Sequence, residues 1–105
     1  MPLREFIAMS QTQPSFVELA TELHRLHDAR EAVIGRALDT LELSHPPLAQ
    51  LVLSCVGDRR RAAHWLVMPQ RAFSGRNACD MLADGDIDGV WEQVVLKQLG
   101  IAAPF

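Results

Sequence analysis

A long run of apolar residues at helical spacing constrains the fold of this chain more than any other feature. No glycine or proline lies between Ser15 and Gly35, so nothing in the sequence forces a break there. The spacing of three and four residues predicts one amphipathic helix from Ser15 to about Glu42, with two helices hinged at residues 27–29 as the alternative. Ser15 and Glu18 fit a capping box at its start. The apolar positions are Phe16, Leu19, Ala20, Leu23, Leu26, Val33, Ile34, Ala37, Leu38 and Leu41.

Prolines, glycines and capping residues divide the rest of the chain into short segments. Pro46 can open a second helix, and Asp58 and Asn77 can cap two later ones. Asp86 or Asp88 can begin the last helix. No segment alternates apolar and polar residues as a half-buried strand does, although the apolar run 48–56 is short enough for a buried strand. The sequence therefore predicts an all-α fold, a small bundle of about five or six helices with a long N-terminal amphipathic helix. The expected later helices are 48–56, 59–67 and 78–83, a single turn at 70–73, and a last helix that ends at Gly100.

Composition excludes some classes of function. The 105 residues suit one domain, and a formal net charge of −3 argues against a general nucleic-acid binder. The cluster Arg59, Arg60 and Arg61 is the one candidate for nucleic-acid contact. Cys55 and Cys79 form no CxxC pair, which predicts reduced thiols. No signal peptide is evident and no apolar run approaches the ~20 residues that span a membrane, so we expect a cytoplasmic protein without membrane contact.

The sequence contains no complete catalytic or metal-binding motif. His24 and His27 share one helix face, but a zinc site needs at least one further protein ligand. The aspartates between Asp80 and Asp88 lack the order of a calcium-binding loop. Neither GxSxG nor a phosphate-binding glycine loop occurs. The sequence predicts no catalytic residue, no metal site and no cofactor, and hence no enzyme.

Residues 59–100 contain apolar residues, a proline and glycines at a recognisable spacing. The pattern runs Ala62-Ala63, Trp65-Leu66, Pro69, Phe73, Gly75, Met81-Leu82, Gly85 and Val90. This pattern resembles the C-terminal toxin-binding domain of the Xre/MbcA/ParS antitoxin family. The chain departs from the family at Asn77-Ala78, where Thr-Pro is frequent, and in having a long helix where many members have a DNA-reading helix-turn-helix.

The resemblance implies a cytoplasmic antitoxin of a type II toxin-antitoxin pair. Its partner would be a cognate RES-domain toxin, a class that degrades NAD⁺, and it would act sterically by covering the active-site entrance. Residues 1–13 lack a period and are expected to be a flexible N-terminal arm, and residues 14–57 form a helical dimerisation part. The resemblance assigns residues 58–105 to a toxin-binding domain. The motif residues Trp65, Leu66, Pro69, Phe73, Gly75, Leu82, Gly85 and Val90 would be structural. The residues expected to contact the toxin are Trp91, Leu96, Leu99, Ile101 and Phe105.

The apolar stripe of the long helix further predicts a homodimer. Two other functions stay open. The chain could be a transcription regulator that contacts DNA through Arg59, Arg60 and Arg61, although the second helix of a 48–67 helix-turn-helix is short and partly needed for the core. It could also be a stand-alone helical adaptor that keeps the fold without the toxin.

Overall fold

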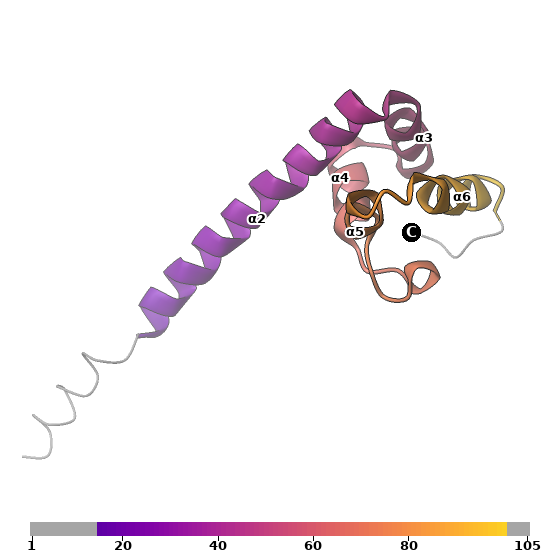
Figure 1. Ribbon diagram of the computed structural model, residues 1–105. Coiled ribbons are helices and arrows are strands. Elements are labelled where there is room, and N and C mark those ends of the chain that lie inside the picture. Colours follow the sequence, from indigo (N-terminus) through magenta and orange to yellow (C-terminus); the bar gives the residue numbers. More distant parts are fainter. Residues whose placement is uncertain (1–14, 101–105) are drawn as a thin grey trace, which may run out of the picture. The chain divides into compact units, whose positions relative to one another are not determined.

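The computed structural model describes residues 15–100, and this part of the chain is all-α, as the sequence predicts (Figure 1). It contains five α-helices, one 3₁₀ turn and no strand. The chain divides into two compact units, one up to Ala32 and one from Val33 onward, and each is described by itself. The elements are α2 (Phe16–Ser44), α3 (Pro46–Val56), α4 (Arg59–Val67), the 3₁₀ turn η1 (Arg71–Phe73), α5 (Ala78–Ala83) and α6 (Ile87–Gln98). The predicted arm at residues 1–13 lies outside the described residues.

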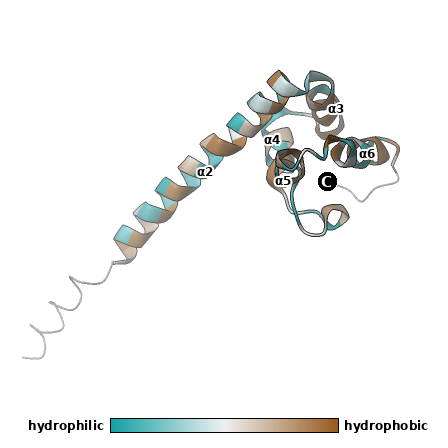
Figure 2. Cartoon of the chain, viewed as in Figure 1, coloured by the Kyte–Doolittle hydropathy of each residue, from teal (hydrophilic) through white to brown (hydrophobic). Residues whose placement is uncertain are grey.

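Helix α2 is one continuous helix, so the alternative of two helices hinged at 27–29 is wrong. The predicted capping box opens it: the Ser15 amide donates to Glu18 Oε2 at 3.1 Å, and the Glu18 amide donates to Ser15 Oγ at 3.2 Å. Polar and apolar residues alternate along its length (Figure 2). In the first unit every residue from Ser15 to Arg30 is exposed. The capping box and the backbone therefore hold this stretch of helix without a buried face.

The core of the second unit gathers side chains from α2, α3, α4, η1, α5 and α6. Helix α3 packs against α4 and α6, and α5 packs against the same two helices. Trp65 is the largest side chain that is fully buried, at 1% exposure. The alternative of a strand over 48–56 is wrong, because α3 is helical and follows a proline start. The buried residues are Ile34, Leu38, Leu41, Leu48, Ala49, Val52, Ala62, Ala63, Trp65, Leu66, Phe73, Ala78, Val90 and Val94.

Side-chain caps set the starts of α4, α5 and α6. Asp58 Oδ1 accepts from the Arg61 amide at 2.8 Å, and Asn77 and Asp80 form a reciprocal capping box. Of the two aspartates considered for α6, Asp86 is the cap and accepts from the Gly89 amide at 2.9 Å. The cap leaves no room beside it, since a Cβ on Gly89 would lie 2.8 Å from Asp86 Oδ2. These local signals fix the helix boundaries that the sequence predicts.

The second compact unit is larger than residues 58–105. It takes in the last turns of α2 and all of α3. The reason is burial: Leu48 and Val52 of α3 are fully buried, and Ile34 and Leu38 of α2 are each 2% exposed. The helices on both sides of Gly57 therefore share one core.

Candidate functional site: partner-binding surfaces

The residues expected to contact a toxin do not share one environment. Trp91 is half-buried and packs against the core, and Leu96 is also half-buried. Leu99, which caps the C-terminal end of α6, is 66% exposed. Val95, one turn earlier, is 38% exposed. Ile101 and Phe105 lie outside the described residues, and among residues 15–100 the exposed large apolar side chains at this end of α6 are Val95 and Leu99.

The motif residues occupy core and turn positions. Trp65, Leu66 and Val90 are at most 1% exposed and Phe73 is 6% exposed, whereas Leu82 is half-buried against the same core. Pro69 is exposed and follows Met68, the C-cap of α4. Gly75 and Gly85 have φ of 86° and 83°, a region that residues with a Cβ rarely adopt. The spacing of the motif thus matches what this fold needs: apolar residues inside, and glycines where the backbone turns.

A groove of about 410 Å³ opens on the second unit, and no motif in the sequence predicts it. Its apolar lining comes from Val33, Ala37, Leu41, Leu66 and Leu82, and polar groups from α2 and His45 border it. It therefore joins the C-terminal part of α2 to α4 and α5. The one indication of the groove in the sequence is that the apolar face of α2 includes Val33 and Ala37 as well as the buried Ile34, Leu38 and Leu41.

A second hollow of about 400 Å³ has a basic border. Arg61, His64 and Lys97 line it together with Trp65 and three further residues of α3 and the end of α4. The hollow joins α3 and α4 to the last turns of α6. The hollow is lined by two Arg or Lys side chains, Arg61 and Lys97, and the groove by one, Arg36, and neither lining includes an Asp or Glu.

The arginine cluster is largely engaged by carboxylates. Arg59 donates to both carboxylate oxygens of Glu42, at 2.6 and 2.7 Å, and to Asp39 at 3.0 Å. This hydrogen bonding to Arg59 lowers the pKa of Glu42, and Glu42 in turn raises the pKa of Arg59. Arg61 pairs with Asp58 at 3.5 Å. Phosphate contact by these two side chains would compete with existing ion pairs, which leaves Arg60 as the exposed member of the cluster that appears in no ion pair among the described residues.

The helix-turn-helix geometry offers little surface for reading bases. Helices α3 and α4 flank Gly57, as a helix-turn-helix requires, but α4 has nine residues and four of them are buried. The buried four are Ala62, Ala63, Trp65 and Leu66. The residues of α4 that are exposed are the three arginines at its start. A recognition helix needs more polar positions along the face that enters the groove of DNA.

No metal cluster is present among residues 15–100, where no three His, Cys, Asp or Glu side chains lie close enough to hold an ion. His27 instead lies 3.8 Å from Glu31 on the same helix. Both cysteines are free thiols, Cys55 half-buried and Cys79 exposed. None of the helices described is long and apolar enough to cross a membrane.

Comparisons with known proteins return no relative. No family model, no curated protein and no solved structure matches this chain. The function is therefore inferred from the residues and surfaces described above.

Proposed function

We propose that this chain is a binding protein, an antitoxin that blocks a RES-domain toxin by covering the entrance to its active site. The proposal carries with it a cytoplasmic location and the absence of catalysis by this chain. The toxin-facing surface is the C-terminal end of α6, with Leu99 as its most exposed apolar residue. Residues Ile101 and Phe105 extend this surface in the proposal.

The observation that carries the proposal is the joint spacing of the motif over residues 59–100. In this chain Trp65, Leu66 and Val90 are core residues, and Gly75 and Gly85 stand where φ is positive. Replacing any of them would disturb the unit that presents α6. Exposure is consistent with the same surface, because Leu99 at 66% and Val95 at 38%, one turn apart on α6, leave apolar area open to a partner.

A co-expression experiment tests the proposal. The full chain is expressed together with a RES-domain toxin encoded beside it, and growth, cellular NAD⁺ and co-purification are measured together. We expect growth to be rescued, NAD⁺ to be retained and a stable complex to form. Leu99→Asp should weaken the complex by about tenfold or more, because it places a charge in an apolar contact.

Leu43→Asp is the matched control. Leu43 is also a largely exposed leucine of the second unit, at 86%, but it belongs to α2 and not to the proposed toxin-binding surface. Equal effects of the two substitutions would argue against α6 as the contact. A folded chain that neither rescues growth nor binds the toxin would overturn the antitoxin function, and the adaptor function would then take its place.

The adaptor function has one observation of its own. The first unit has exposed apolar residues between Phe16 and Leu26, and these residues lie outside the proposed toxin-binding surface. A chain that uses this face to join other proteins would retain it after losing a toxin partner. DNA regulation has less support, because Arg59 and Arg61 are already paired with carboxylates.

A further inference from the structure

The first unit presents an apolar face that no other described residue of this unit covers. Phe16 is 89% exposed, Leu19 42%, Leu23 66% and Leu26 56%. Helices in proteins gain most of their stability from tertiary packing of an apolar face, and this stretch of α2 has no such packing within its own unit. A partner that covers the face would stabilise the helix as well as bury the side chains.

Spacing identifies what kind of surface covers it. The four apolar residues and Arg30 follow one another at intervals of three, four, three and four, which is the a and d pattern of a coiled coil. That pattern packs on another helix with the same pattern. A lipid surface is disfavoured, since residues 15–32 carry four acidic side chains against two arginines. The matching surface that is certain to be available is a second copy of this chain.

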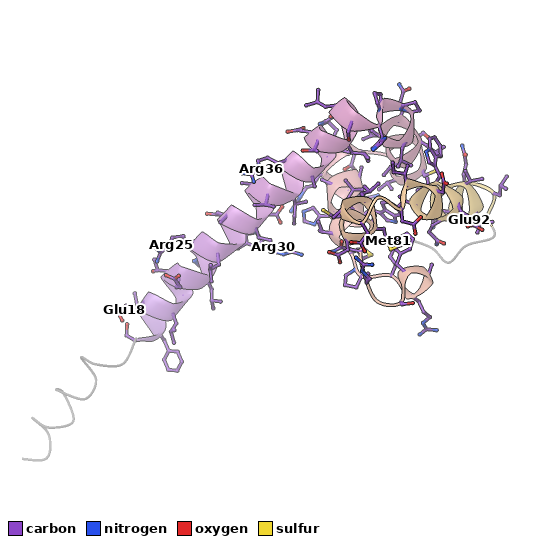
Figure 3. All side chains as sticks on the ribbon, in the orientation of Figure 1. Glu18, Arg25, Arg30, Arg36, Met81 and Glu92 are labelled. Atoms are coloured by element: carbon purple, nitrogen blue, oxygen red, sulfur yellow. The ribbon has the colours of Figure 1, made fainter. Side chains whose placement is uncertain are left out.

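Arg30 distinguishes a parallel from an antiparallel pairing of two copies. It occupies an a position, and among the described residues no ion pair includes it. Figure 3 shows it extending from the opposite side of α2 to Arg25. In a parallel dimer the two Arg30 side chains would oppose each other at the same level of the seam, which places like charges together.

An antiparallel dimer removes this conflict. When Leu23 lies opposite the partner copy's Leu26, Arg30 lies opposite its Leu19. Glu22 follows Leu19 by three residues and flanks the seam, so it faces the Arg30 of the other copy. Glu22 already pairs with Arg25 within its own helix, and a second guanidinium can share the carboxylate.

We propose that the face formed by Phe16, Leu19, Leu23, Leu26 and Arg30 joins two copies of this chain as an antiparallel pair of α2 helices. The two-fold axis passes beside residues 24 and 25, midway between Leu23 and Leu26. The seam is short, at or below the roughly 1,000 Å² of total buried area that a specific interface needs. The dimer is therefore weak and forms in the micromolar range of concentration.

Sedimentation equilibrium of the full chain over a series of concentrations tests the proposal. We expect a monomer–dimer equilibrium that Leu23→Asp weakens by about tenfold or more. Leu43→Asp is the matched control and should leave the equilibrium unchanged. Both leucines are exposed, so neither change disturbs the core, and near-ultraviolet circular dichroism of the two tryptophans verifies that the second unit stays folded.

A charge exchange tests the orientation. Arg30→Glu should weaken the antiparallel dimer, because the new carboxylate faces Glu22 of the other copy. Adding Glu22→Arg should restore it. In a parallel dimer the two glutamates at position 30 would still oppose each other, and the double variant would not recover.

Two results would overturn the proposal. One is a wild-type chain that stays monomeric at every concentration, and the other is a dimer that Leu23→Asp leaves intact. A monomeric chain whose toxin complex is lost on Leu23→Asp would assign the face to the toxin. The dimer and the antitoxin function fail separately, because the sedimentation experiment contains no toxin.

Discussion

The two ends of α2 have the same apolar spacing and different surroundings. Near its C-terminal end, Ile34, Leu38 and Leu41 are each 2% exposed and belong to the core. Near its N-terminal end, Leu19, Leu23 and Leu26 are 42–66% exposed. Periodicity thus establishes that a helix has an apolar face, but the residues that cover the face come from elsewhere in the chain or from another chain.

The largest difference between the two ends should appear on truncating a leucine. Leu38→Ala should lower the free energy of unfolding by about 2–5 kcal/mol, because it leaves a cavity in the core. Leu23→Ala should change it by less than about 0.5 kcal/mol at concentrations where the chain is monomeric. Urea unfolding followed by tryptophan fluorescence measures both. Equal losses would mean that the N-terminal end of α2 is buried in solution.

Caps should show the same contrast with a smaller effect. Asn77→Ala should cost about 1 kcal/mol of global stability, since Asn77 Oδ1 accepts from the Asp80 amide at 2.7 Å in the core-forming unit. Ser15→Ala removes an equivalent cap from an exposed helix end and should only increase its fraying. Urea unfolding reports the first and amide hydrogen exchange at residues 16–19 the second. A global loss on Ser15→Ala would contradict the comparison.

Glycine substitutions should change stability in opposite directions. Gly85 has φ of 83°, so Gly85→Ala should destabilise the second unit by about 1 kcal/mol. Gly35 lies within α2 with no heavy atom within 4 Å of an added Cβ, so Gly35→Ala should stabilise by about 0.5–1 kcal/mol. Thermal unfolding of both variants measures the sign. A destabilising Gly35→Ala would reveal a neighbour at that position.

The ion pair of Glu42 with Arg59 should give the smallest effect. Arg59 lowers the pKa of Glu42 from 4.5 in the folded chain. The pair therefore adds stability above pH 4.5, and that stability is lost as the pH falls through the lowered pKa. Glu42→Gln should slightly lower the melting temperature at neutral pH and cease to do so in acid. Asp28→Asn, which removes a negative charge from the exposed end of α2 at a residue outside the described ion pairs, is the control, and an equal pH-dependent change there would argue against the pair as the cause.

Local features of this fold could be predicted from the sequence, and non-local ones could not. Ser15, Asp58 and Asn77 cap helices through contacts with residues three positions later. A few consecutive residues of sequence are therefore enough to predict these caps. The bond from Arg59 to Glu42 spans seventeen residues and depends on how α2 and α4 pack. For that reason the arginine cluster looked available for DNA in the sequence and is largely paired in the structure.

The residues of the candidate surfaces also differ in whether a local sequence pattern predicts their environment. Trp65 and Val90 were recognisable as core because each lies on the apolar face of a capped helix. The groove beside Val33 and Ala37 arises where three helices meet, and no single helix has a pattern for it. Trp91 illustrates the limit at the proposed toxin contact: spacing placed it on the last helix, but its half-burial depends on the neighbours of α6.

The close approach of the Asp86 side chain to Gly89 restricts which residues can occupy positions 86 and 89. Within a helix, alanine normally replaces glycine with a gain in stability. At position 89 an added Cβ would instead displace the Asp86 carboxylate and so disturb its hydrogen bond to the amide that it caps. Asp86 and Gly89 should therefore vary as a pair: variants that give up the carboxylate at 86 become tolerant of larger residues at 89, and those that keep it do not.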